Sequence, residues 1–396
     1  MKNWAAPSGA ALFVGTGPTL CGSPAMSSTL KRLIHSIALD LEGDVERIQR
    51  LVHGDGNDTH VRVLAYAGYR SPDRVRLMGR VVRYAKPLDA GEGMLTRLRA
   101  MLAIYNSREL PGVTVRMNGY GREHEVVTDE EGYFSFDLPV DEPLPDVTKW
   151  EPVLLSVPHR QAQQDTLEAP VLAPGRDDRW GVISDIDDTV IETGATNFVK
   201  NWRRVLIERP QDRLAVPGAS TLYTMIARDH AAPIRPFFYV SSSPWNLYGF
   251  ITEFMQLNGI PHGPMFLKDI GIDQTKFIKA SHGTHKLDAI ETILSSYPGF
   301  RFLLIGDNGQ EDVAIYAKAV ADYPGRVGAV FIRDVSGTCR QGAKAELLAG
   351  IEARGIPTYC GATFDDAVAV VESLDLDRPT EAAKAVSTPA LGPITQ

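Results

Sequence analysis

The chain is poor in cysteine, in long apolar runs and in excess positive charge, and each shortage excludes a class of protein. Only three of its 396 residues are cysteines, and Cys21, Cys339 and Cys360 are too scattered to predict a disulfide framework or a zinc site. No apolar run is long enough to span a membrane. The net charge of −8 gives no general basic surface for nucleic acid. We therefore expect a protein of a reducing compartment, with a cytoplasmic location.

The length of the chain indicates more than one domain. A single hydrophobic core rarely serves 396 residues, so two domains with a helical segment are expected. Residues 1–25 have one apolar patch broken by Pro and Gly, which predicts a disordered leader, with a weak secretory signal as the alternative. Residues 377–396 are expected to form a disordered tail.

Residues 26–57 are expected to form an amphipathic helical segment. Lysine and arginine flank its apolar stripe, so a helix on a membrane surface is one interpretation. Glu42, Asp44 and Glu46 would weaken attraction to anionic lipid, so we favour a helix packed on the protein's own core, with peripheral membrane contact as the alternative. The stripe recurs at helical spacing and consists of Leu30, Leu33, Ile34, Ile37, Leu41, Val45, Ile48 and Val52.

Residues 58–170 are expected to form a β-sandwich-like domain. Short alternating stretches such as "HVRVLAYAGYRS" and "VRLMGRVVRYA" are separated by turn residues, which is typical of antiparallel strands. The stretch "TDEEGYFSFDL" resembles the acidic turn and strand of small β-sandwich modules, and a helical insertion at residues 91–110 interrupts the pattern. No cluster of His, Cys or carboxylates here has catalytic spacing, so we expect a binding or stabilising domain of unknown protein partner.

Residues 176–376 show alternating strand and helix patterns. The apolar runs "WGVIS", "PFFYVS", "RFLLIG" and "VGAVFI" are separated by helical patterns. Strands that alternate with helices predict an α/β fold, a doubly wound parallel sheet with both faces covered. Ligands of such sheets bind at the carboxyl ends of the strands.

Polar side chains gather where three of these strands end. A lone Asp after a strand is usually a helix cap or a turn residue. Three strands that end in polar clusters predict a site instead, and clustered carboxylates need positive charge nearby. The residues concerned are Asp185, Asp187 and Asp188 after the first strand, Ser241, Ser242 and Ser243 after the second, and Asp307 and Asp312 after the third.

Lys286 is a candidate for that positive charge. The stretch "GTHKLDAIETIL" predicts a helix capped by Thr284, with Lys286 in its first turn. A cation there opposes the helix dipole, which costs about 0.3–1 kcal/mol. An exposed lysine offset by Asp288 is one interpretation, and a lysine directed at the carboxylates is the other.

The motifs resemble those of a known superfamily. "DIDDT" at 185–189 resembles the first motif of the haloacid dehalogenase superfamily of phosphotransferases, "FFYVSSS" the second, Lys286 the third and "GDNGQED" at 306–312 the fourth. More narrowly, "SDIDDTV", "YVSSSPWNLY", "GPMFLKD" and "IGDNGQED" resemble the actin-patch-associated phosphatidate phosphatase family of fungi and its bacterial relatives. The resemblance covers residues 178–375 and implies a haloacid dehalogenase-like phosphatase domain. The short interval between the first two motifs predicts a small cap.

The resemblance implies the catalytic roles. Asp185 would attack phosphorus and form an aspartyl-phosphate. Asp187 would protonate the leaving alkoxide and then activate water. Ser241 would hydrogen-bond a phosphoryl oxygen, and Lys286 would stabilise the transferring group. Because dehalogenases lack the acid at the position of Asp187, the sequence favours phosphoryl transfer over carbon–halogen cleavage.

The resemblance also implies a bound Mg²⁺, since an anionic nucleophile otherwise repels a phosphate dianion. The expected metal site comprises Asp185, Asp187 through its backbone carbonyl, Asp307, and Asp312, which orients the water shell of the metal or Lys286. Besides Lys286, Thr189 and Ser242 are the residues expected to bind phosphate or steady the loop that does.

Three functions are compatible with these motifs. The first is a Mg²⁺-dependent phosphatidate phosphatase that yields diacylglycerol and phosphate. The second is a soluble phosphomonoesterase of the same mechanism that acts on a sugar, nucleotide or protein phosphate. The third, a non-enzymatic adaptor, is disfavoured by the intact motifs. Phe198, Trp202, Trp245 and Tyr248 would line an apolar rim in the lipid case or simply pack the cap. Because every predicted catalytic residue follows Arg176, a chain that starts there is expected to act on small phosphates.

Overall fold

The computed structural model describes residues 61–83, 110–158, 166–176, 179–192, 215–228, 235–268, 282–374 and 376. Residue contacts divide the chain into two compact units, Met1–Asp55 and Gly56–Gln396, and all described residues lie in the second. The predicted leader, amphipathic helix, C-terminal tail and nearly all of the helical insertion lie outside the described residues. Among the described residues, no helix has the length and apolar character needed to cross a membrane.

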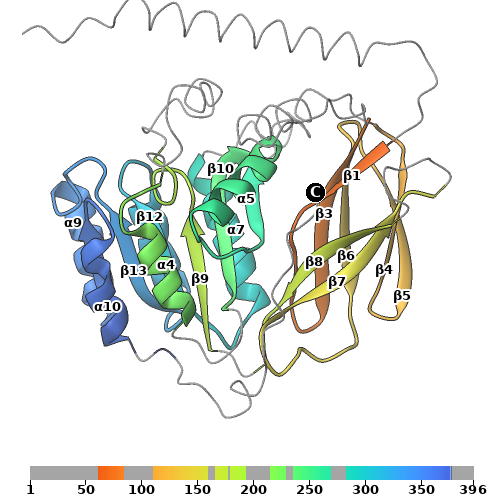
Figure 1. Cartoon of the computed structure of the whole chain (residues 1–396). Coiled ribbons are helices and arrows are strands. Elements are labelled where there is room, and N and C mark those ends of the chain that lie inside the picture. Colours follow the sequence, from red (N-terminus) through yellow and green to blue (C-terminus); the bar gives the residue numbers. More distant parts are fainter. Residues whose placement is uncertain are drawn as a thin grey trace, which may run out of the picture. The chain divides into compact units, whose positions relative to one another are not determined.

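A six-stranded parallel sheet forms the C-terminal half of the described chain (Figure 1). Its strands are β9 (Trp180–Asp185), β10 (Phe237–Pro244), β11 (Met265–Lys268), β12 (Arg301–Asp307), β13 (Val327–Arg333) and β14 (Thr358–Gly361). The spatial order is β11-β10-β9-β12-β13-β14, and every neighbouring pair is parallel. The predicted parallel sheet and the mixed α/β class are confirmed.

Helices cover both faces of this sheet. Val182 and Phe237 lie in one core with residues of α4 (Ala219–Arg228) and α5 (Tyr248–Leu257). Ile183 and Phe238, the next residues along each strand, lie in a second core with residues of α7 (His282–Ser296), α8 (Asp312–Asp322) and α9 (Gly342–Glu352). Burial on both faces explains why these strands are continuous apolar runs rather than alternating ones. The shorter elements are η2 (Trp245–Leu247), η3 (Asp365–Ala367) and α10 (Val368–Ser373).

The sheet reverses its direction of growth at β9. From β9 the chain builds β10 and β11 on one side, and β12, β13 and β14 on the other. At such a reversal the connections leave in opposite directions, so a crevice opens beyond the carboxyl ends of the two central strands. In this protein those ends carry Asp185 on β9 and Asp307 on β12.

The N-terminal half of the described chain is an eight-stranded, mainly antiparallel sheet. Its order is β1-β3-β2-β8-β7-β4-β5, with β6 paired to β3 and one parallel pair, β2 with β8. The strands are β1 (Val61–Ala65), β2 (Gly68–Arg70), β3 (Arg74–Arg83), β4 (Thr114–Gly119), β5 (Arg122–Val127), β6 (Tyr133–Pro139), β7 (Lys149–Ser156) and β8 (Leu167–Ala173). The predicted β-rich region is confirmed, whereas its sandwich-like arrangement stays a prediction.

The acidic turn before β6 forms as its sequence predicts. The Asp129 carboxylate accepts the backbone N–H groups of Glu131 and Tyr133, each at 2.9 Å. Gly132 has a φ of +80°, which glycine adopts at little cost. This turn directs β6 back along β3 and places Tyr133 at the boundary with the parallel sheet.

The two sheets share hydrophobic cores. Tyr66 and Tyr133 belong to the core that contains α4 and α5, and Tyr69 and Leu172 belong to the core that contains α7 and α8. The β-rich sheet also has a core of its own, centred on residues such as Phe136. By residue contacts Gly56–Gln396 is one compact unit, and the domain boundaries predicted within it stay a prediction.

Two of the three cysteines form a disulfide, which their scattered positions in the sequence did not predict. Cys339 follows β13 and Cys360 lies on β14, and the two are bonded with their Cα atoms 6.6 Å apart. The residues are 21 positions apart in sequence but meet because β13 and β14 are neighbours. Spacing along the chain gave no sign of this bond, and with it the cysteines no longer favour a reducing compartment.

His262 makes the stability of the protein depend on pH. Its ring packs against Trp150 of β7 in a tilted arrangement, with ring centroids 5.0 Å apart, and burial lowers the pKa of His262 from 6.5 to about 4. Between these values the unfolded chain holds a proton that the folded protein lacks, so stability is expected to fall as the pH drops from 6.5 to 4. Thermal denaturation across this range tests the prediction. His262→Gln should flatten the decline, and an unchanged decline would contradict it.

Candidate active site

Asp185 lies at the centre of the parallel sheet, in the last position of β9, and is only 2% exposed. The chain then turns sharply: Asp188 has a φ of +56°, and its N–H donates to the carbonyl of Ile191 at 2.8 Å. Aspartate tolerates this left-handed conformation better than most residues. The turn brings the Thr189 hydroxyl to 3.3 Å from Asp185 Oδ2, to which it donates.

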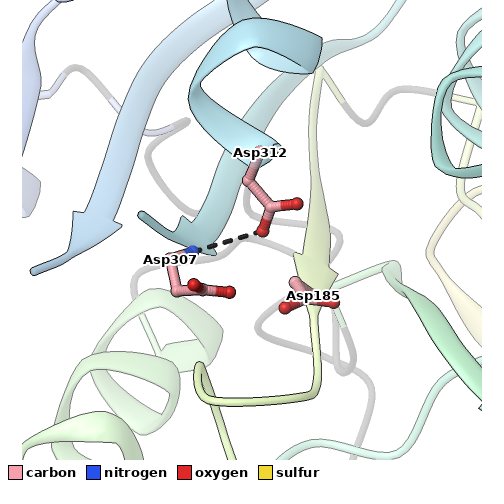
Figure 2. Close-up of side chains that lie close together, drawn as sticks. All are labelled: Asp185, Asp307 and Asp312. Atoms are coloured by element: carbon pink, nitrogen blue, oxygen red, sulfur yellow. Dashed lines mark hydrogen bonds between the residues drawn. The ribbon is translucent and has the colours of Figure 1, made fainter. Parts of the chain in front are cut away.

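Asp307 and Asp312 meet beside Asp185 at the carboxyl end of β12 (Figure 2). Asp312 is in the first turn of α8, and its Oδ2 accepts the N–H of Asp307 at 3.2 Å. Gly306 permits this approach, because a Cβ atom there would lie 2.5 Å from Asp312 Oδ2. The "GD" pair of the sequence is thus a steric requirement of this site.

Lys286 reaches the carboxylates from the N-terminal part of α7. Its Nζ atom lies 2.9 Å from Asp185 Oδ1 and 2.7 Å from Asp312 Oδ1, and the side chain is 4% exposed. Burial by itself would lower the pKa of Lys286, but the charges of Asp185 and Asp312 outweigh burial and raise that pKa above its ordinary value. The exposed-lysine interpretation is therefore wrong, and Lys286 is a buried cation.

The three carboxylates are costly to ionise together. Burial raises the pKa of Asp185 well above its ordinary value, even though Lys286 acts against this. For Asp307, burial and then the charge of Asp312 raise the pKa from 3.8 to about 7. One ammonium group against three carboxylates leaves the cluster short of positive charge.

Two serines of β10 hold the Asp187 carboxylate. The hydroxyl of Ser241 donates to Asp187 Oδ2 at 2.5 Å, and the hydroxyl of Ser243 lies 3.0 Å and 3.2 Å from the two carboxylate oxygens. The N–H of Ser243 also donates to Ser241 Oγ at 2.8 Å. Burial raises the pKa of Asp187, and the bond from Ser241 opposes that shift. Asp187 is thus fixed in orientation, and burial makes its carboxyl harder to ionise than in water.

The structure brings together most of the residues that the sequence singled out. Ser242 differs: it lies between Ser241 and Ser243 on β10, is half-buried, and donates no hydrogen bond to Asp187. Side chains alternate along a strand, so Ser243 shares the side of Ser241 and Ser242 does not. This two-residue period was visible in "SSS" and could have identified Ser243. The residues brought together are Asp185, Asp187, Thr189, Ser241, Lys286, Asp307 and Asp312.

Arg333 is a further site residue that the sequence analysis missed. It ends β13, donates from Nη1 to the carbonyl of Asp188 at 2.8 Å, and forms an ion pair with Glu192. Its own carbonyl accepts the N–H of Asn308, next to Asp307. Arg333 therefore links the turn after Asp185 to the turn after Asp307. A charged residue that ends an apolar strand is a weak sequence signal of such a role.

The predicted aromatic rim is not present in the described part of the chain. Phe198 and Trp202 lie outside the described residues. Trp245 and Tyr248 are each 8% exposed and pack against Tyr66 of the β-rich sheet. Trp245 and Tyr248 are therefore packing residues, but the contacts that the structure describes are with the β-rich sheet, whereas the alternative expected them to pack the cap.

The donor set fits a divalent cation that prefers oxygen. One carboxylate oxygen from each of Asp185, Asp307 and Asp312 lies within 4.8 Å of the others. Asp307 Oδ2 is buried and has no hydrogen-bond partner in the described part of the chain. Asp185 Oδ1 likewise has only its ion pair with Lys286 there. Buried oxygens left in this way are what a hard cation such as Mg²⁺ would satisfy.

The part of the chain that carries these residues is similar to known proteins. Residues 180–334 match the family model described as the catalytic domain of phosphatidate phosphatase APP1. Over 153 residues the chain is 31% identical to phosphatidate phosphatase APP1 of Saccharomyces cerevisiae. The aligned stretch covers 39% of this chain and 25% of the yeast protein. Over 229 residues it is 30% identical to an uncharacterized protein of Schizosaccharomyces pombe, covering 54% of this chain and 35% of that protein.

The matches cover only part of each relative. The chain spans between a quarter and about a third of the curated relatives that it matches. Among solved structures, a carbohydrate acetylesterase from Xanthomonas citri is similar over 79% of this chain and 67% of its own, with 11% identity and a TM-score of 0.26, which is too low to assign a fold. The matches support a phosphatase and agree with the resemblance to phosphatidate phosphatases that the motifs indicated. Membership of the haloacid dehalogenase superfamily stays a prediction.

The three carboxylates have only one cation, Lys286, to neutralise them. Two similar substitutions, Asp307→Asn and Asp312→Asn, are therefore expected to have opposite effects on the stability of the metal-free protein. Asp307→Asn should raise the melting temperature, and the gain should grow as the pH rises from 4 to 7, because over that range the carboxyl ionises in the unfolded wild-type chain while it stays largely protonated in the folded protein. Asn can still accept the N–H groups of Gly309 and Gln310.

Asp312→Asn should instead destabilise the protein by roughly 1–3 kcal/mol, because an amide group cannot accept from both Lys286 Nζ and the N–H of Asp307. Thermal denaturation with a chelator present measures both variants. Destabilisation of similar size in both would show that the charge argument is wrong.

Proposed function

We propose that this chain is a phosphatase that hydrolyses phosphatidate to diacylglycerol and phosphate. The observation that carries the proposal is the convergence of Asp185, Asp187 and Lys286 at the carboxyl end of the central strand, within the residues that match the phosphatidate phosphatase catalytic domain. A nucleophile, an acid and a cation are the parts that phosphoryl transfer to a carboxylate requires. These residues lie at the reversal point of the sheet, and folds of this kind bind their ligands at that point.

Asp185 is the proposed nucleophile. One of its carboxylate oxygens attacks phosphorus, and the bond between phosphorus and the lipid oxygen breaks, which leaves an aspartyl-phosphate on Asp185. The Thr189 hydroxyl, which donates to Oδ2, keeps the carboxylate in one orientation. Water then attacks the phosphorus of this intermediate, releases phosphate and restores the carboxylate.

Asp187 is the proposed general acid and base. It gives its proton to the departing alkoxide in the first step and takes one from the attacking water in the second. Burial favours the protonated form that the first step needs. Ser241 and Ser243 hold the carboxylate in place, and Ser241 is also the proposed donor to a phosphoryl oxygen.

Positive charge is the third requirement. Lys286 would stabilise the charge on the transferring phosphoryl group from its position beside Asp185. Mg²⁺ would be held by the carboxylates of Asp185 and Asp307 and by the backbone carbonyl of Asp187, and it would supply further charge neutralisation. Asp312 positions Lys286 and the backbone of Asp307 rather than reacting itself.

The substrate class rests on the similarity to phosphatidate phosphatase APP1. The alternative is a phosphomonoesterase of the same mechanism that acts on a small sugar, nucleotide or protein phosphate. Peripheral contact with a membrane would favour the lipid, and a cytoplasmic location suits either substrate. The two hypotheses separate in a direct assay.

A substrate panel is the test. The purified full chain with Mg²⁺ should release phosphate from phosphatidate in mixed micelles faster than from a sugar phosphate, a nucleotide or a phosphopeptide. Asp185→Asn should reduce release to that of a blank without enzyme, while circular dichroism shows that the variant is folded. A preference for a soluble ester would favour the alternative. Undiminished hydrolysis by Asp185→Asn would refute the nucleophile assignment.

The acid role of Asp187 predicts a dependence on the leaving group. Asp187→Asn should lose ~10²–10⁴-fold in rate with an alkyl phosphate, because loss of a general acid typically costs that much. The loss should be smaller with p-nitrophenyl phosphate, whose leaving group needs no proton. Asn can still accept the hydroxyl groups of Ser241 and Ser243. Equal losses on both substrates would argue against the acid role.

A further inference from the structure

The segment that orients Asp187 continues directly into the boundary with the β-rich sheet. Ser241 and Ser243 are followed by Pro244, which ends β10, and by η2, Trp245–Leu247. Because Ser243 is two residues from Trp245, the position of η2 fixes where the Ser243 hydroxyl can reach. What holds η2 therefore bears on the geometry of Asp187.

Asn246 of η2 is held by two side chains of the β-rich sheet. Its Oδ1 accepts from Arg80 Nη1 and from the Tyr133 hydroxyl, each at 3.0 Å. Arg80 is itself fixed, since its Nε donates to the carbonyl of Glu131 at 2.8 Å and its guanidinium lies 4.7 Å from the centre of the Tyr133 ring. Arg80 is 5% exposed, so its charge is buried at this boundary.

Residues on either side of Asn246 contact the same sheet. The Trp245 ring stacks on Tyr66, with ring centroids 4.7 Å apart. The Tyr248 hydroxyl accepts the N–H of Ala67 at 2.7 Å. These contacts surround the segment that carries Ser243, so they restrain it in more than one direction.

We propose that the β-rich region positions the active site, with Arg80 and Tyr133 acting as positioning residues for Ser243 and, through it, for Asp187. This inference rests on the proposed function, because it assigns the purpose of the region to the acid of that reaction. A chain that starts at Arg176 would lack Tyr66, Arg80 and Tyr133. Contrary to the expectation from the sequence, such a chain should therefore lose activity on small phosphates as well.

The two sheets are also joined at a place far from Ser243, so stability alone does not explain why contacts between the sheets lie next to this serine. Tyr297, directly after α7, donates its hydroxyl to the carbonyl of Arg70 at 2.8 Å, so the two sheets are also joined at the amino end of the parallel strands. Tyr297 and Tyr133 thus make similar bonds across the same boundary, one far from Ser243 in the fold and one close to it. Tyr297→Phe is the matched control for Tyr133→Phe.

The experiment compares these variants in the full chain. Tyr133→Phe and Arg80→Met should each lower kcat about 10-fold on an alkyl phosphate, because a misplaced acid loses part of its effect. They should change it by about twofold or less on p-nitrophenyl phosphate, which needs no acid. Tyr297→Phe should stay within about twofold of wild type on both substrates at a comparable melting temperature.

Asn246 provides a rescue test. Asn246→Asp keeps an oxygen that accepts from Arg80 and Tyr133, so its activity should stay close to wild type. Asn246→Leu removes the acceptor and should behave like Tyr133→Phe. If Asn246 had a purely structural role, the kcat of each Asn246 variant would fall in step with its melting temperature, by the same factor on both substrates.

Hydrogen exchange provides a readout that does not depend on catalysis. The N–H of Ser243 donates to Ser241 Oγ, so its exchange should speed up in Tyr133→Phe and Asn246→Leu but not in Tyr297→Phe. If the wild-type chain hydrolyses no phosphate, the proposed function fails, and exchange alone decides the positioning. If the wild type is active and Tyr133→Phe matches Tyr297→Phe in kcat and in exchange, the positioning proposal is overturned.

Discussion

Lys286 places one ammonium group between Asp185 and Asp312 in a region nearly closed to water, and the site depends on this interaction. Without it, the carboxylates of the central strands would face one another buried and unpaired, which is strongly unfavourable. With it, the cluster still has three carboxylates for one cation. The remaining charge shortage makes the site suited to receive a divalent cation and a phosphate together, since each offsets the cost of the other.

The fold provides the positions that this interaction needs. The reversal at β9 brings Asp185 next to the end of β12, and Gly306 allows Asp312 to approach the backbone of Asp307. Arg333 ties the turn after β9 to the strand beyond β12. The β-rich sheet holds η2, the segment that directly follows the serines of β10. Asp185, Asp187 and Asp312 are thus each restrained by an element other than the one that carries them.

The parts that could be predicted from sequence are those with local signals. Buried parallel strands are continuous apolar runs, so their ends, and hence Asp185 and Asp307, were identifiable. Ser243 had a local signal too, the two-residue period of a strand. The Cys339–Cys360 disulfide and the packing of Trp245 on Tyr66 had none, because each joins segments that only the sheet order or the boundary between sheets brings together. The role of the β-rich region belongs to the same class: its residues lack catalytic spacing because they act through Asn246.

Titration calorimetry with Mg²⁺ tests the central claim, that the buried carboxylates form an incompletely neutralised cation site. The account predicts that the wild-type chain binds one Mg²⁺ per molecule and that binding raises its melting temperature, as any ligand specific to the folded state does. Asp307→Asn should lose both effects, since it removes a charge and the buried oxygen that has no hydrogen-bond partner in the described part of the chain. Equal binding by the variant, or no binding by the wild type, would contradict the account.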